Sequence, residues 1–107
     1  MDLPELTVAD VAARLGESNF YVFDNNGPGR WRRGHVPGAV NLDAHNYDAS
    51  ELPADRSATL VFYCSGRGCR SCSIAARRAS ELGYPNVFVM PEGIAGWENA
   101  SRPIETG

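Results

Sequence analysis

The stretch that most constrains this chain is ATLVFYCSGRGCRSC, residues 58–72, which joins three kinds of local structure. Its first half, 58–64, is an apolar run that predicts a buried strand. A loop with two glycines follows, and then a helix that Ser71 can cap and Gly83 can end. The apolar face of this predicted helix comprises Cys72, Ala75, Ala76, Ala79 and Leu82.

Helical and extended segments alternate along the rest of the chain. Thr7 and Asp10 are close to the capping-box pattern and predict a helix start, and Gly16 predicts its end. Further strands are expected at 19–24, 39–42 and 86–90. Short helical segments are expected around Trp31, at 50–52 and before Pro103. This alternation predicts an α/β fold, a layered sandwich with a mostly parallel sheet.

Length and composition narrow the class of protein. The 107 residues, 43% of them hydrophobic, suit a single domain spanning 1–107. The net charge of -3 argues against non-specific nucleic-acid binding, and no apolar run is long enough to span a membrane. The first residues lack the pattern of a signal peptide, so we expect reduced cysteines and a cytoplasmic location.

The three cysteines, spaced C-x4-C-x2-C, are open to a metal, a redox or a nucleophilic interpretation. The spacing is that of part of an iron–sulfur motif, but the chain has no fourth cysteine. A zinc site would have to borrow His35 or His45. Because Cys64 ends a strand and Cys72 lies on a helix face, we expect that the three thiols do not converge. We therefore expect no metal.

The loop after Cys64 has the features of an anion-binding site. Ligands of open parallel sheets bind beyond the carboxyl ends of the strands, where this loop is expected. Its glycines let backbone N–H groups turn inward, and the following helix start adds partial positive charge. Two arginines add full charges, so we expect the pKa of Cys64 to be lowered and the thiolate to dominate at pH 7. The loop residues are Ser65, Gly66, Arg67, Gly68, Cys69 and Arg70.

The other two cysteines have different expected roles. Cys69 is either a small loop residue or a redox partner that forms a disulfide with oxidised Cys64. Cys72 is expected to be a buried small apolar residue of the helix.

Four stretches, in order, resemble the single-domain rhodaneses, the sulfurtransferase superfamily. The active-site stretch resembles in particular a subset with a YC-x4-C loop, here Tyr63 to Cys69. Together the four stretches cover nearly the whole chain. They are VFD (22–24), RWRRGHVPGAVNL (30–42), LVFYCSGRGCRS (60–71) and LGYPNVFVMPEGIAGW (82–97).

The resemblance implies a rhodanese-like three-layer α/β/α sandwich and a mechanism. Cys64 would attack a sulfane sulfur donor such as thiosulfate and carry the sulfur as a persulfide. The amides of residues 65–70 would cradle the anion, and Arg67 and Arg70 would orient the donor. A thiol or cyanide, or a sulfur-relay protein, would accept the sulfur, and no cofactor is implied. Asp24 is expected to support the site by anchoring backbone near it.

The loop also departs from the usual family pattern. Arg70 follows Cys64 by one residue more than is common in rhodaneses, which matches the related cysteine phosphatases. A phosphatase or arsenate reductase acting on an oxyanion is therefore an alternative. Tyr63 stands where those phosphatases carry histidine, and no general-acid aspartate is evident. A further alternative is a non-catalytic rhodanese module that binds partners. The stretch after the first strand also departs from the family pattern, because Asn26 stands where the D-x-R stretch has arginine.

Several other conspicuous residues are expected to be structural. His35 should make structural hydrogen bonds, and His45 should lie on the surface. Trp97 should belong to the core. The basic residues of the stretch after the first strand are expected to be solvated surface, and they are Arg30, Arg32 and Arg33.

Overall fold

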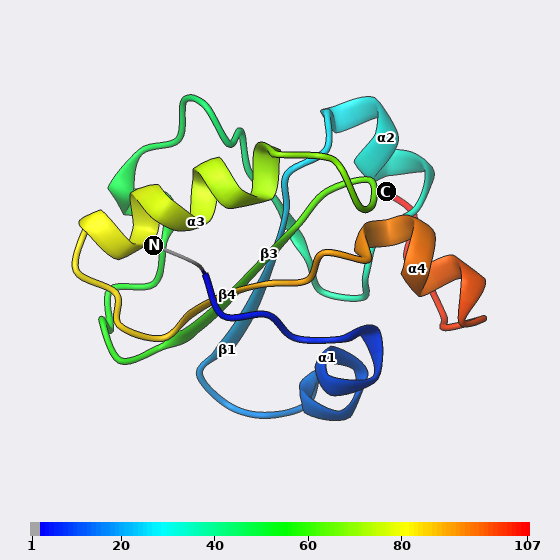
Figure 1. Cartoon of the computed structure of the whole chain (residues 1–107), viewed down its shortest axis with the longest axis horizontal. Helices are drawn as coiled ribbons and strands as arrows, with labels where there is room; N and C mark the ends of the chain where they lie inside the picture. Colours follow the sequence, from blue (N-terminus) through cyan, green and yellow to red (C-terminus); the bar gives the residue numbers. More distant parts are fainter. Residues whose placement is uncertain (1–2) are drawn as a thin grey trace.

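The computed structural model describes residues 3–107 and contains a parallel sheet covered by helices (Figure 1). The strands are β1 (Phe20–Asp24), β2 (Val40–Asn41), β3 (Thr59–Tyr63) and β4 (Val87–Val89). The helices are α1 (Val8–Arg14), α2 (Pro28–Arg33), α3 (Ser71–Glu81) and α4 (Gly93–Asn99), with a 3-10 turn, η1, at Ala49–Glu51. The strand order is β2-β1-β3-β4, and every pairing is parallel. The predicted elements are thus confirmed, with small differences at their ends.

Side chains of the central strand β3 alternate between two buried cores. Leu60 and Phe62 belong to one cluster of buried residues, and Val61 and Tyr63 belong to the other. Because helices cover both faces of this parallel sheet, these four successive side chains are all buried and form an apolar run. Successive side chains still point to opposite faces. Cys64 comes directly after the strand and continues the face of Leu60 and Phe62.

Different segments cover the two faces of the sheet. Helix α3 and the segment 42–52 contribute to the cluster that contains Phe62. Helices α1 and α4 contribute to the cluster that contains Tyr63, and Figure 1 shows α1 on the side of the sheet opposite to α3. Trp97 of α4 is 1% exposed, as expected of a core residue. The expected α/β/α sandwich with a parallel sheet is therefore confirmed.

The helix ends follow the local signals in three of four cases, including Gly16, which directly follows the C-cap of α1. Thr7 and Asp10 form the capping box that begins α1. Gly83 follows α3 with a φ of 101°, a left-handed conformation that favours glycine. The start of α3 differs from the prediction, because Arg70 is the N-cap and Ser71 is the first helical residue. No side chain caps this end, so its free amides face the loop that follows Cys64.

The segment after β1 is tied to the end of the chain. His35 is buried, stacks on Trp31 and donates from Nδ1 to the carbonyl of that residue, 2.7 Å away. The backbone of His35 also pairs with that of Glu105. These contacts confirm the structural role expected for His35.

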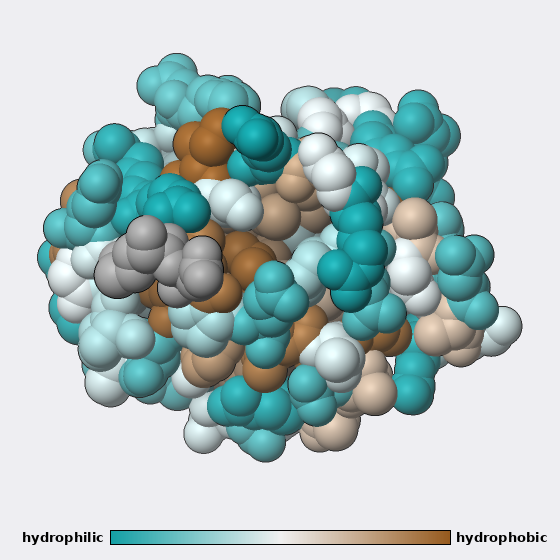
Figure 2. Space-filling model, viewed as in Figure 1, coloured by the Kyte–Doolittle hydropathy of each residue, from teal (hydrophilic) through white to brown (hydrophobic). Residues whose placement is uncertain are grey.

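The outer surface is mixed in character. Polar residues cover most of the face in Figure 2, with smaller apolar patches between them. Within residues 3–107, no helix is both long and apolar enough to cross a membrane.

A buried polar pair joins β1 to β3 immediately before the candidate site. The Tyr63 hydroxyl donates to Asp24 Oδ2 at 2.6 Å and accepts from the amide of Val36 at 3.0 Å. Both side chains are fully buried. Burial raises the pKa of Asp24, and the hydrogen bond from Tyr63 partly opposes that rise. The hydroxyl thus satisfies two groups that water cannot reach.

We predict that Tyr63→Phe lowers the free energy of unfolding by about 1–3 kcal/mol, since it leaves a buried carboxylate oxygen and a buried amide without partners. Denaturant titration followed by circular dichroism measures the loss. Tyr21→Phe is the matched control, because Tyr21 is 40% exposed and should tolerate the change. Equal stability of the two variants would contradict the structural role of the pair.

Candidate active site

Cys64 lies at the carboxyl end of β3, where the chain leaves the sheet. Only 2% of the residue is exposed, and its side chain belongs to the buried cluster beneath α3. Ser65, Arg67 and Gly68 of the following loop are exposed. The cysteine is therefore closed off on the core side, and the loop separates it from solvent.

The loop is a compact turn with specific backbone requirements. Gly68 has a φ of 91°, and the amide of Cys69 donates to the carbonyl of Gly66 at 3.2 Å. The amide of Cys69 is thus engaged within the turn. The amide of Cys72, at the start of α3, donates to the sulfur of Cys64. The helix start consequently contributes a donor to the sulfur, as the anion-binding interpretation requires.

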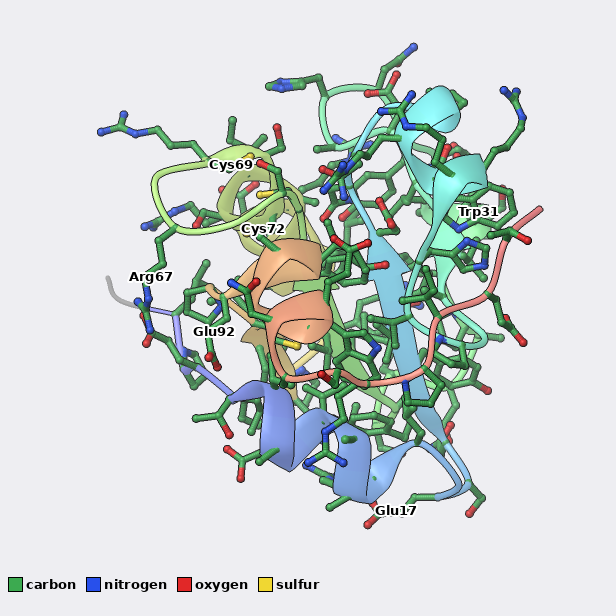
Figure 3. All side chains as sticks on the ribbon, turned by 90° about the vertical axis from the view of Figure 1, so that its right-hand side faces the viewer. Glu17, Trp31, Arg67, Cys69, Cys72 and Glu92 are labelled. Atoms are coloured by element: carbon green, nitrogen blue, oxygen red, sulfur yellow. The ribbon has the colours of Figure 1, made fainter. Side chains whose placement is uncertain are left out.

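Cys64 has both other thiols as neighbours, contrary to the expectation from the sequence, although within residues 3–107 the three are not arranged to hold a metal ion. Cys64 makes side-chain hydrogen bonds with both Cys72 and Cys69. Cys72 is 4% exposed and shares the buried cluster with Cys64, and Cys69 packs against it. Figure 3 shows Cys69 and Cys72 close together on the loop and the adjoining helix. The apolar face of α3 packs on the sheet face that carries Cys64, and so it brings Cys72 to Cys64.

The expected lowering of the Cys64 pKa is wrong for this resting arrangement. The hydrogen bond to Cys72 raises the pKa of Cys64, and burial adds to the rise. The same hydrogen bond lowers the pKa of Cys72. Two thiols in contact do not both ionise easily, so the first negative charge of the pair rests on Cys72 while Cys64 donates to it.

The two loop arginines lie on the outside of the site. Arg67 and Arg70 are exposed, and Figure 3 shows Arg67 directed away from Cys69 and Cys72. Arg70 lines a shallow hollow with Ser73, Ile74 and Arg77 along one face of α3. Both arginines thus lie on the outer side of the loop, and their expected role in orienting a donor stays a prediction.

Asp24 lies on the opposite face of the sheet from Cys64. Besides Tyr63, it accepts a hydrogen bond from the amide of Asn26 at 2.8 Å. Asp24 thus fixes the backbone that follows β1 and the tyrosine that precedes Cys64. This geometry agrees with a supporting role for Asp24.

A polar hollow lies beside the site, at the carboxyl ends of β1 and β2. The amide of Asn25 donates to the carbonyl of Tyr63 at 2.7 Å, so Asn25 is the neighbour of Cys64 across the strands. Among residues 3–107, Asn25 Oδ1 is buried without a hydrogen-bond partner and has unused capacity for a polar ligand, whereas the Asn26 side chain lies close enough to Asp24 to lower its pKa. The hollow is lined by Asn25, Asn26, Gly27, Pro28, Asn41, Asp43, Ala44 and His45.

The remaining candidates lie apart from the thiols. His45 is exposed, as expected, and Arg30 lies 4.0 Å from Glu98 in a surface ion pair. Arg32 and Arg33 are exposed, which agrees with a solvated surface. Among residues 3–107, no group of three or more histidine, cysteine or acidic side chains is arranged to hold a metal ion.

Helix α4 supports the loop from the other side, a role that the sequence did not predict. The amides of Ile94 and Ala95 donate to the carbonyls of Cys64 and Ser65, each at 3.0 Å. Gly93 makes this approach possible, because a Cβ there would lie 2.5 Å from the Cys64 carbonyl oxygen. Its φ of 61° also favours glycine. The glycines before Trp97 indicate a close backbone approach, but the sequence alone does not show that the loop after Cys64 is the segment approached.

Comparison with known proteins agrees with this geometry. Residues 7–100 match the family model of the rhodanese-like domain. The chain is 27% identical over 107 residues to the uncharacterized protein YibN of Escherichia coli K12, covering 95% of this chain and 72% of that protein. It is 29% identical over 106 residues to the thiosulfate sulfurtransferase GlpE of Actinobacillus succinogenes, covering 99% and 94%. The BH2092 protein of Bacillus halodurans has the same fold, with a TM-score of 0.89 at 21% identity over 96% and 77% of the two chains.

We predict that Gly93→Ala lowers the free energy of unfolding by about 1–3 kcal/mol, because the methyl group meets the loop backbone and φ is unfavourable. Denaturant titration measures this loss, and the amide NMR signals of residues 64–66 should shift. Gly16→Ala is the control, since nothing lies within 4 Å of a Cβ at Gly16. Unchanged stability and unchanged loop signals in Gly93→Ala would refute the role assigned to this contact.

Proposed function

The chain belongs to the rhodanese-like domain family, and from this membership we propose that it is a sulfurtransferase that carries sulfane sulfur on Cys64. The observation that carries the proposal is the position of Cys64, at the end of the central strand and next to the uncapped start of α3. The Cys72 amide already donates to the Cys64 sulfur. The similarity to a thiosulfate sulfurtransferase supports the same reaction class.

In the proposed reaction, the Cys64 thiolate attacks the outer sulfur of thiosulfate. The S–S bond of the donor breaks, sulfite leaves with the electron pair, and a Cys64 persulfide forms. The amides of the loop and of the helix start stabilise the anions, and no cofactor takes part. In the second half-reaction a thiol, cyanide or the thiol of a sulfur-relay protein takes the outer sulfur.

The state of the cysteines and the charges around them bear on the cellular compartment and on the charge of the sulfur donor. All three cysteines are free, which supports a reducing compartment, and we propose the cytoplasm. Arg67 and Arg70 would attract an anionic donor to the loop, since both side chains are exposed. We propose that the rhodanese-like domain spans residues 1–107 as one unit.

A second function is favoured by one feature, the six-residue spacing from Cys64 to Arg70. This longer loop matches cysteine phosphatases and would admit a larger oxyanion such as phosphate or arsenate. Tyr63 argues against this second function. Its hydroxyl is buried against Asp24 on the opposite face of the sheet, so the Tyr63 side chain does not reach the loop. Sulfur transfer is therefore preferred, and a non-catalytic partner-binding module is the outcome if neither activity is found.

We predict that a single turnover with thiosulfate releases about one sulfite per protein, because each Cys64 accepts one sulfur. Cys64→Ser should release none. A colorimetric sulfite assay on the reduced protein measures both, and Ala13→Ser is a control with normal release, because Ala13 is exposed on α1, on the side of the sheet opposite to α3.

Two outcomes would overturn the proposal. Equal sulfite release by wild type and Cys64→Ser would remove Cys64 from the reaction. Absence of sulfite together with Cys64-dependent hydrolysis of an aryl phosphate would establish the oxyanion enzyme instead.

A further inference from the structure

The three thiols form a directed chain of hydrogen bonds, and the two neighbours of Cys64 play different parts in it. Cys69 donates to the sulfur of Cys64, and Cys64 in turn donates to the sulfur of Cys72. Cys72 is therefore the proton acceptor of the chain.

The position of Cys72 suits a thiolate. It is the second residue of α3, an eleven-residue helix whose first turn has no capping side chain. The positive end of the helix dipole stabilises an anion there, and the Ser73 amide and hydroxyl both donate to the Cys72 sulfur. A negative charge can thus form on a side chain that is 96% buried.

Cys72 reaches Cys64 from the core side, and the loop covers the other side. Both cysteines lie in the buried cluster beneath α3, whereas Ser65, Arg67 and Gly68 are exposed. Because Cys72 shares the buried cluster with Cys64, we expect a sulfur added to Cys64 to lie toward the exposed loop. The added sulfur and Cys72 would then lie on opposite sides of Cys64 Sγ, as an in-line displacement requires.

We propose that Cys72 is a second catalytic thiol, which displaces hydrosulfide from the Cys64 persulfide and closes a Cys64–Cys72 disulfide. This inference rests on the proposed persulfide chemistry of Cys64. It adds a product, hydrosulfide, and a requirement for a dithiol or low-molecular-weight thiol that reduces the disulfide.

The steps balance in atoms and electrons. The reaction requires the singly protonated pair, whose proton lies on Cys64 and moves to Cys72 as the Cys64 thiolate attacks thiosulfate and sulfite leaves. The same proton then moves to the outer persulfide sulfur while Cys72 attacks Cys64 Sγ. The persulfide S–S bond breaks, the Cys64–Cys72 bond forms, and hydrosulfide leaves with the electron pair. Two thiol sulfurs are oxidised, and the sulfane sulfur is reduced.

The same geometry argues against Cys69 as the resolving thiol. Cys69 is partly exposed and is held in the loop by the bond from its amide to Gly66. It lies on the side of the loop, where the outer sulfur is expected, and it lacks the helix start that stabilises a thiolate. Cys69→Ser therefore distinguishes the two thiols by the fate of the sulfur on Cys64, and its rate of sulfite release need not equal that of wild type.

The test is a single turnover with thiosulfate in the absence of any reductant, followed by intact mass and a hydrosulfide assay. Wild type and Cys69→Ser should release about one hydrosulfide per protein and end about 2 Da lighter than the reduced protein, as a disulfide. Cys72→Ser should release sulfite but no hydrosulfide, and it should stay about 32 Da heavier as a persulfide. If Cys72→Ser does not fold, Cys72→Ala repeats the test with an apolar side chain that suits the buried site. The wild-type measurement tests the proposal without any substitution.

The outcomes separate this inference from the function on which it rests. Wild type that stays about 32 Da heavier and releases no hydrosulfide would overturn the role of Cys72 and leave sulfur transfer intact. Loss of hydrosulfide in Cys69→Ser, with normal release in Cys72→Ser, would assign resolution to Cys69. Absence of sulfite in every variant would instead defeat the proposed function itself.

Discussion

The site depends on the close packing of α3 against the central strand. The face of α3 that meets the sheet consists of short side chains, and Ala75, Ala76 and Ala79 are fully buried. Short side chains let a helix lie close to a sheet, so Cys72 at its first turn reaches Cys64 at the strand end. A larger residue in this face would separate the two sulfurs and also remove the amide donor from Cys64.

Much of the fold follows from local patterns in the sequence. The apolar run at 58–64 and the alanine-rich stripe after it predict the strand and helix that frame the site, because burial imposes these periodicities directly. The capping box at Thr7 and the glycine at Gly83 mark helix ends through backbone chemistry that needs no tertiary context. The start of α3 was misplaced by one residue, since Ser71 makes no cap in the folded chain.

The thiol cluster shows where local reasoning failed, although the necessary information was present. Cys64 continues the face of Leu60 and Phe62, and Cys72 begins the apolar face of α3. Considering both patterns together predicts that the two sulfurs meet, whereas considering each alone does not. The expectation of a lowered Cys64 pKa is wrong for the same reason, because it considered the positive charges of the loop and left out Cys72. The contact between the two thiols raises the pKa of Cys64 and lowers that of Cys72. The contact of Gly93 with the loop joins distant segments, and no local pattern encodes it.

In the proposed mechanism Cys64 carries the transferred sulfur, and Cys72 lies on the core side of Cys64 as the resolving thiol. A crystal structure of Cys72→Ser after reaction with thiosulfate tests this most directly, because the anomalous signal of sulfur locates every sulfur atom. We expect an additional sulfur bonded to Cys64 Sγ and directed toward the loop, away from residue 72. An additional sulfur on Cys69, or one directed toward residue 72, would contradict this mechanism.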